Sequence, residues 1–216
     1  MRWNTVLFDL DGTVTDPKVG ITCAAAYALR QLGRGDVDPD RLTAFIGPPL
    51  HESFPKLCGL DQEETDCAIR EFRVYYADRG WAENIPYKGI GELLTQLHAA
   101  GLRLVIATSK PESTARRILE HFGLAQYFDL ICGADPQDKA SADKASVIRK
   151  ALAHMGSGAE DSIMVGDRSY DIIGAHAAGL TSVGVLYGYG SREELEAAGA
   201  DHLAADLAEL RNILLT

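Results

Sequence analysis

The clearest chemical signal in this chain is a pair of carboxylates, one residue apart, after an apolar run near the N-terminus. Residues 6–8 are apolar, and Asp9, Leu10, Asp11 and Gly12 follow them. Side chains at i and i+2 of an extended chain point the same way, so Asp9 and Asp11 can face one pocket. A buried charge without a partner is costly, and a hard dication that takes oxygen ligands would be a natural partner. A carboxylate can also attack an electrophile, which indicates phosphoryl transfer.

Calcium-binding loops of the EF-hand type share the D-x-D-G pattern and are the alternative for these residues. Such a loop needs a Glu at its twelfth position and a helix before it. Counted from Asp9, the twelfth residue is Gly20, and strand-like residues precede Asp9. The sequence therefore favours a site at the end of a strand over a calcium loop.

Two hydroxyl residues, Thr108 and Ser109, follow a second apolar run at 102–107. A hydroxyl group and free backbone N–H groups at the start of a helix make a good site for a phosphate oxygen. The alternative is a helix N-cap with Pro111 in the first turn, and the two interpretations are compatible.

A lysine and two more aspartates complete the set of candidate site residues. Lys144 lies where a helix should begin and can neutralise a phosphate or balance Asp9, although a solvated surface charge is the alternative and Lys139 a competing choice. Asp167 follows the apolar run 162–165, and Asp171 lies four residues later, on the same face of a helix. A capping Asp with a salt-bridged neighbour is the alternative, but it does not explain why carboxylates recur at strand ends.

Strand-like runs alternate with amphipathic segments over most of the chain. This alternation predicts βαβ units around a parallel sheet, an α/β fold in which ligands bind at the carboxyl ends of the strands. Strands are expected at 5–8, 102–107, 128–132, 162–165 and 181–185, and helices at 90–100, 112–122, 145–154, 170–178 and 206–214.

The segment 17–86 breaks this alternation. It has helical patterns at 21–32, 50–57 and 62–76 and no convincing strand. The simplest account is a small helical domain at 17–86, inserted into an α/β core domain made of residues 1–16 and 87–216.

Composition narrows the classes of function. The net charge of −10 argues against a nucleic-acid polymer as partner, because binding its backbone needs clustered Lys and Arg. The four cysteines form no C-x-x-C pair, which argues against a zinc site or a disulfide scaffold and fits the reducing cytoplasm. The few residues ahead of the carboxylate pair leave no room for a cleavable signal sequence, so none is expected, and no apolar run approaches the ~20 residues that span a membrane.

Together, D-x-D-G-T, the strand-terminal Thr-Ser, the Lys and G-D-x-x-x-D resemble, in this order, the haloacid dehalogenase superfamily of phosphohydrolases. The resemblance implies a doubly wound Rossmann-like sheet with an inserted α-helical cap domain. It also implies Asp9 as nucleophile and Asp11 as general acid and base, with phosphate bound by Thr108, Ser109 and Lys144. The implied cofactor is Mg²⁺, held by Asp9, the main-chain carbonyl of Asp11, and Asp167, with Asp171 either on the metal or supporting its ligands.

The substrate implied is a small phosphate monoester. The loop with Phe45, Gly47, Pro48 and His51 resembles the specificity loop of phosphoglycolate phosphatase-like and 5′-nucleotidase-like members. Lys144 lacks the Pro-x-Pro that commonly follows it in phosphoglycolate phosphatases, which favours the nucleotidase-like branch.

Halide displacement would not need Asp11. A sugar-phosphate mutase or a phosphonate hydrolase of the same superfamily is the alternative. The loop lacks the Lys and Arg that the cap of a mutase usually offers, and the inserted segment has only Lys18 and Lys56, neither of which lies where the resemblance would put the lysine of a phosphonate hydrolase. A non-catalytic module that binds phosphate or metal is the third hypothesis. The chain could be a monomer or a homodimer.

Overall fold

The computed structural model describes residues 2–135 and 142–216, which divide into two compact units. One unit comprises Met1–Thr15 and Pro86–Thr216, and the other comprises Asp16–Ile85. We describe the first as the core unit and the second as the helical unit. The chain passes between them through β2 (Thr15–Asp16) and β3 (Ile85–Pro86), which pair as a two-stranded sheet.

The core unit is built on a six-stranded parallel sheet, as the alternating sequence pattern predicts. Its strand order is β5-β4-β1-β6-β7-β8. The strands are β1 (Thr5–Phe8), β4 (Arg103–Pro111), β5 (Leu130–Ala134), β6 (Ser162–Gly166), β7 (Thr181–Val185) and β8 (His202–Ala204).

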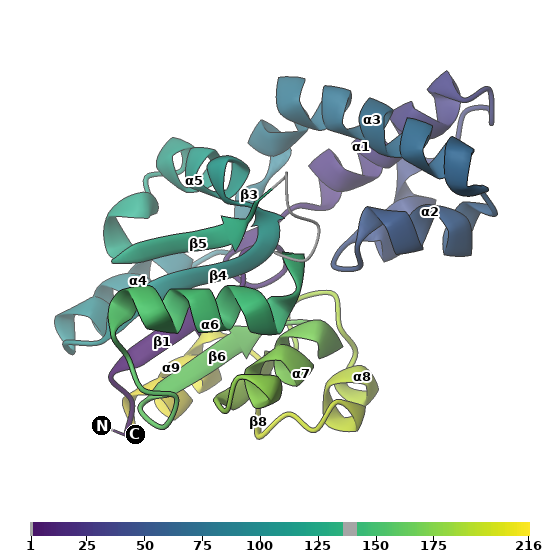
Figure 1. Ribbon diagram of the computed structural model, residues 1–216. Helices are drawn as coiled ribbons and strands as arrows, with labels where there is room; N and C mark the ends of the chain where they lie inside the picture. The colour runs from purple at the N-terminus through teal and green to yellow at the C-terminus, as the bar shows by residue number, and fades with distance from the viewer. Residues whose placement is uncertain (1, 136–141) are drawn as a thin grey trace. The chain divides into compact units, whose positions relative to one another are not determined.

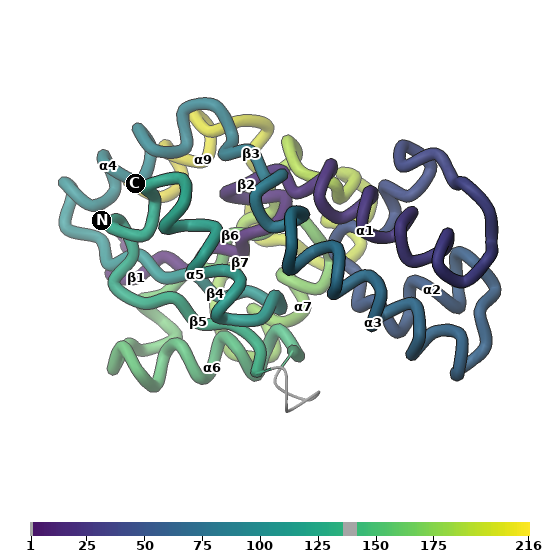
Figure 2. The backbone as a smooth tube through the Cα atoms, turned by 90° about the horizontal axis from the view of Figure 1, so that it is seen from above, coloured from purple at the N-terminus to yellow at the C-terminus, as the bar shows by residue number. Residues whose placement is uncertain are grey.

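Helices cover both faces of this sheet (Figure 1). Figure 2 shows α6 (Lys144–Met155) on one side and α4 (Ile90–Ala99) with α9 (Leu207–Leu215) on the other. Leu7, Val105 and Met164 of the central strands are fully buried in one cluster with Ile148 of α6 and Ala175 of α7 (Ser169–Ala177). Because both faces are covered, the central residues of the strands are mostly apolar. The other helices among the described residues of this unit are α5 (Glu112–His121), η3 (Ala125–Tyr127) and α8 (Arg192–Ala197).

The central strand β1 lies at the point where the order of the strands reverses. From β1 the chain first builds β4 and β5 on one side, and then β6, β7 and β8 on the other. Phe8 is paired with Ile106 of β4 and with Val165 of β6, so Asp9, which follows Phe8, lies beside Ala107 and Gly166 of the flanking strands. Ligands of open α/β sheets bind in the crevice that such a reversal creates.

The helical unit contains α1 (Lys18–Gln31), η1 (Pro39–Phe45), α2 (Leu50–Cys58), α3 (Gln62–Asp78) and η2 (Gly80–Glu83). Small buried residues of α1 allow the neighbouring helices of this unit to pack close to it; they are Ala24, Ala25 and Ala28. Gly20 allows the closest approach, because a Cβ there would lie 2.1 Å from the carbonyl oxygen of Gly80.

Several boundaries differ from the prediction. The segment 17–86 was expected to contain no strand, yet it includes the two-residue β3. β4 continues to Pro111 rather than ending at residue 107, because its pairing with β5 resumes after an irregularity. β8 and α8 were not predicted, since three and six residues carry too little periodicity to be recognised. Within the described ranges, no helix has both the length and the apolarity needed to cross a membrane.

Candidate active site

Three aspartates that are far apart in the sequence meet at the carboxyl edge of the sheet. Asp9 directly follows β1, Asp167 directly follows β6, and Asp171 lies in the first turn of α7. One carboxylate oxygen from each lies within 4.8 Å of the others. The sequence pattern predicted that these residues would share a site, and this register brings them together.

Lys144 lies inside this group of carboxylates. Its Nζ is 2.8 Å from Oδ1 of Asp9 and 2.7 Å from Oδ1 of Asp171, and it also donates to the carbonyl oxygen of Ala107 at 3.1 Å. Lys144 is only 6% exposed, so it is not the solvated surface charge of the alternative interpretation. The competing Lys139 lies outside the described residues.

Local sequence explains how a lysine can be buried here. Asp143 caps α6 by accepting a hydrogen bond from the backbone of Ser146, so Lys144 is the first helical residue. The side chain of Lys144 runs over Gly174 of α7, where a Cβ would come within 2.6 Å of its Cγ. A larger residue at position 174 would displace the lysine.

Burial and mutual repulsion dominate the electrostatics of the site. Burial raises the pKa of Asp167 well above its usual range, and the charges of Asp171 and Asp9 add to this effect. Burial also raises the pKa of Asp171, to about 6, although Lys144 opposes the shift. Burial disfavours the charged form of Lys144, but the neighbouring Asp171 and Asp9 outweigh it and raise the pKa of the lysine.

A turn after β7 holds Asp167 in place. The backbone N–H of Tyr189 donates to Oδ2 of Asp167 at 2.8 Å. A Cβ at Gly188 would lie 2.3 Å from Cβ of Asp167, and one at Gly190 would lie 2.0 Å from its carbonyl oxygen. Position 12 requires glycine for two reasons. Its φ is 86°, and a Cβ added there would lie 2.1 Å from Oδ2 of Asp167. The sequence alone did not indicate this role of the turn.

Asp11 points to a different partner. Its carboxylate is ion-paired with Lys110, and Asp11 is not part of the three-aspartate cluster found among the described residues. Burial raises the pKa of Asp11, while the charge of Lys110 and the hydrogen bond from it lower the pKa. The sequence showed Lys110 directly after Thr108 and Ser109, but did not indicate which side chain it would reach.

Thr108 is buried, and its Oγ1 accepts a hydrogen bond from the backbone of Lys110 at 3.3 Å. The alternative role as a helix N-cap is wrong, because α5 begins at Glu112 and Pro111 occupies the N-cap position. Thr108 and Ser109 instead belong to β4, at the edge where Asp9 follows β1. Their predicted role as phosphate ligands stays a prediction.

The predicted specificity loop belongs to the helical unit. Phe45 is buried and packs edge-on against Phe54, with ring centroids 4.9 Å apart, so it serves the interior of this unit. Gly47 has a φ of 103° and forms the turn before α2, with Pro48 partly exposed. His51 is exposed on α2 near Glu52.

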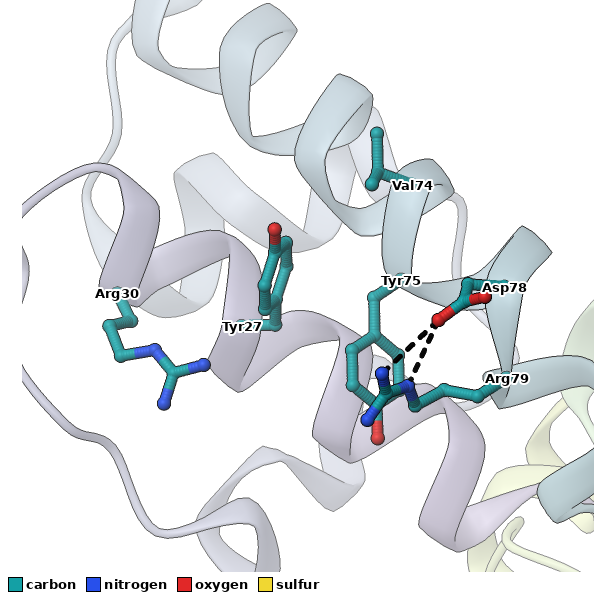
Figure 3. A pocket seen from close by; sticks show the side chains of 6 residues that line it. All are labelled: Tyr27, Arg30, Val74, Tyr75, Asp78 and Arg79. Atoms are coloured by element: carbon teal, nitrogen blue, oxygen red, sulfur yellow. Dashed lines mark hydrogen bonds and ion pairs between the residues drawn. The ribbon is translucent and has the colours of Figure 1, made fainter.

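The helical unit also carries a surface pocket of about 290 Å³, shown in Figure 3. Tyr27 and Tyr75 pack with centroids 5.6 Å apart, and the Arg79 guanidinium lies over the Tyr75 ring while also pairing with Asp78. The two arginines that line the pocket, Arg30 and Arg79, each lie over a tyrosine ring, and Arg79 also pairs with Asp78. The pocket contains none of the predicted site residues.

The acidic cluster fits a hard divalent cation. Asp167 is fully buried, and within the described part of the chain its Oδ1 has no hydrogen-bond partner. Three carboxylates carry more charge than Lys144 can balance, and an orphaned buried oxygen is costly. Oxygen-only ligands suit Mg²⁺ rather than softer metals.

Comparison with known proteins finds relatives that match most of this chain. Residues 6–185 match the model of the haloacid dehalogenase-like hydrolase family. A 5′-nucleotidase of Pseudomonas aeruginosa is 42% identical over 99% of this chain and 96% of its own. Tyrosine-protein kinase PtkA of Mycobacterium tuberculosis is 43% identical over 97% of this chain and 72% of its own. Other relatives are named phosphoglycolate phosphatase and pyrophosphatase.

A solved structure shows the same fold. The crystal structure of a predicted phosphatase from Clostridium acetobutylicum has a TM-score of 0.94 and 44% identity, and the match covers 100% of this chain and 99% of that one.

We predict that Gly188→Ala weakens binding of Mg²⁺ by about 10-fold or more, because the added methyl group displaces the Asp167 carboxylate. Isothermal titration calorimetry of the metal-free protein measures the affinity. Gly91→Ala is the matched control, since a Cβ at Gly91 meets nothing closer than Leu124 at 3.9 Å. Unchanged affinity in a folded Gly188→Ala protein would contradict the role of the turn.

We also predict that Mg²⁺ stabilises the protein more as pH rises. The raised pKa values of Asp167 and Asp171 mean that the folded state favours their protonated forms. Their contribution to stability is complete below the unfolded pKa and is lost as pH rises through the folded values, about 6 for Asp171. A bound cation reverses that loss.

Melting temperatures with Mg²⁺ and with EDTA, at about pH 5 and about pH 8, measure this effect. The melting temperature with Mg²⁺ should exceed that with EDTA by more at the higher pH. An equal difference at both values, or none, would count against a cation among these carboxylates.

Proposed function

This chain belongs to the haloacid dehalogenase-like hydrolase family and is a phosphatase, and we propose that it hydrolyses small phosphate monoesters with Mg²⁺ through an aspartyl-phosphate intermediate. The observation that carries the mechanism is the position of Asp9. Its carboxylate is held by Lys144 at the carboxyl end of the central strand, beside Asp167 and Asp171.

Asp9 is the proposed nucleophile. Its Oδ1 is fixed by Lys144, which leaves its other oxygen to attack phosphorus. In that step a bond forms between the Asp9 oxygen and phosphorus, and the bond from phosphorus to the ester oxygen breaks. Holding the nucleophile in line before the reaction lowers the entropic part of the barrier.

The charge of the phosphoryl group has to be balanced before Asp9 can approach it. Lys144 supplies one positive charge, and Thr108 and Ser109 offer hydroxyl and backbone donors on the neighbouring strand end. Asp9, Asp167 and the main-chain carbonyl of Asp11 would hold Mg²⁺, with Asp171 beside them. When bound, the ion supplies positive charge that stabilises the phosphoryl oxygens.

Asp11 is the proposed general acid and base. It protonates the leaving ester oxygen and then takes a proton from the water that hydrolyses the aspartyl-phosphate. Burial raises its pKa, which favours a carboxyl group that holds a proton to donate. Its place outside the three-aspartate cluster is consistent with this role.

Within this activity we propose a nucleoside 5′-monophosphate or phosphoglycolate as substrate. The relative of Pseudomonas aeruginosa named 5′-nucleotidase supports the first, and a relative named phosphoglycolate phosphatase supports the second. The absence of Pro-x-Pro after Lys144 favours the nucleotide. The exposed parts of the loop around Gly47, Pro48 and His51 are the proposed specificity elements. The described cysteines are free, which supports a reducing cytoplasm as the proposed location.

A second candidate is phosphoryl transfer to a tyrosine hydroxyl instead of water, because a relative of similar identity is named a tyrosine-protein kinase. The chain has no Gly-Lys dipeptide and therefore no P-loop of the form G-x-x-x-x-G-K-[ST]. The same aspartate would then have to carry the phosphoryl group. Mutase and phosphonate hydrolase activities remain the alternatives within the superfamily.

We predict that the wild-type protein hydrolyses p-nitrophenyl phosphate with Mg²⁺ and loses this activity with EDTA. Asp9→Asn should abolish turnover while the melting temperature shows a folded protein, and Asp11→Asn should lower kcat at least ~10²-fold, because hydrolysis of the aspartyl-phosphate then lacks its general base. Asp66→Asn, an exposed site on α3, is the matched control and should be fully active. Normal activity of Asp9→Asn would exclude Asp9 as nucleophile.

A panel of phosphorylated compounds tests the proposed substrate class. We expect the highest kcat/KM for a nucleoside 5′-monophosphate, followed by phosphoglycolate, with inorganic phosphate as the measured product. Activity on a hexose phosphate only in the presence of a bisphosphate would indicate a mutase. Transfer of phosphate from ATP to a tyrosine-containing polymer, without release of phosphate, would favour the kinase candidate.

A further inference from the structure

We propose that Lys110 is a positioning residue for the general acid: it anchors one oxygen of the Asp11 carboxylate and leaves the other uncommitted for proton transfer. This inference rests on the proposed role of Asp11 and adds a residue that the sequence pattern did not assign. It is carried by a contact within the core unit, by the local irregularity of β4, and by an unpartnered oxygen.

The contact is specific to one oxygen. Lys110 Nζ donates to Oδ2 of Asp11, and both side chains are largely buried, with 9% and 15% of their surfaces exposed. Oδ1 of Asp11 is buried as well, yet among residues 2–135 and 142–216 it has no hydrogen-bond partner. A carboxylate held at one oxygen keeps a fixed orientation, and its second oxygen can still bind or release a proton.

An irregularity in β4 places Lys110 at this position. Ala107 pairs with Cys132 of β5 and Pro111 pairs with Ala134, so β4 advances four residues while β5 advances two. Extra residues in a strand redirect the side chains that they carry. The backbone of Lys110 is also tied back to Thr108 Oγ1.

Gly133 of β5 makes room for this irregularity. A Cβ at position 133 would lie 2.6 Å from the carbonyl oxygen of Lys110 and 2.7 Å from the Cα of Glu112. The redirected segment therefore packs directly against the backbone of the neighbouring strand.

The two neighbouring aspartates are paired with different lysines. Asp9 is paired with Lys144, which also contacts Asp171, whereas Asp11 is paired with Lys110. Lys144 thus contacts two members of the three-aspartate cluster, and Lys110 contacts the proposed general acid. If Lys110 only neutralised the negative charge of the pocket, it would not need to contact Asp11 in particular.

Leaving groups of different basicity test the proposal. p-Nitrophenolate departs without a proton, whereas an alkoxide needs one from the acid. Lys110→Met, which keeps the apolar stem but removes the charge, should lower kcat/KM for β-glycerophosphate at least ~10²-fold and for p-nitrophenyl phosphate less than about 10-fold. kcat/KM is the proper measure, because hydrolysis of the aspartyl-phosphate follows the departure of the leaving group.

A double-mutant cycle separates positioning from a merely structural role. In the Asp11→Asn background, Lys110→Met should cause little further loss on β-glycerophosphate, because its effect passes through Asp11. Lys110→Arg should keep most of the preference of the wild-type protein. Lys150→Met is the control, since Lys150 is an exposed lysine of α6. Lys110→Gln replaces Lys110→Met if the latter does not fold.

Equal losses on both esters, additive losses in the cycle, or no loss at all would overturn the proposal while leaving the proposed function intact. If the wild-type protein hydrolysed neither ester, the proposed function would fail and this inference with it. The two failures are therefore distinguishable in one set of measurements.

Discussion

The site depends on the repulsion among three carboxylates that the fold forces together. Asp9, Asp167 and Asp171 are brought within 4.8 Å by the ends of β1 and β6 and the start of α7. Burial and this repulsion raise the pKa of Asp167 and of Asp171. Lys144 offsets part of the cost, and a cation would offset more of it. If these groups served only stability, replacing them with apolar residues would make the protein more stable. Their arrangement is therefore explained by chemistry rather than by folding.

Glycine is the residue that makes this crowding possible. Gly12 and Gly188 bring backbone against Asp167, Gly174 gives space to the stem of Lys144, and Gly166 leaves room for Asp171, whose Cγ would lie 2.2 Å from a Cβ there. Each of these positions would need the backbone or a charged group to move if a methyl group were added. The precision of the site therefore depends on the close approach of main chain as much as on the polar side chains themselves.

The sequence predicted the α/β class and the parallel sheet, because long periodic elements are strong signals. It also placed Asp9, Asp11, Asp167 and Asp171 in one pocket, and the cluster contains all of these except Asp11. It did not predict β8 or α8, which are short, nor the continuation of β4 to Pro111. It also missed the turn around Gly188 and the partner of Lys110. Both are contacts between segments distant in sequence, and the spacing of residues along one strand carries no information about them.

Asp9 and Asp11 show why residue type alone does not assign a role. Alternation along a strand predicts that they face the same way, but β1 ends at Phe8 and the chain then turns, with Gly12 at a φ of 86°. Beyond that point the direction of a side chain is set by its partner and not by the pleat. Asp9 is ion-paired with Lys144, beside Asp167 and Asp171, whereas Asp11 is ion-paired with Lys110. Two identical side chains, two residues apart, thus have different environments, each with its own lysine, as the proposed roles of nucleophile and acid require.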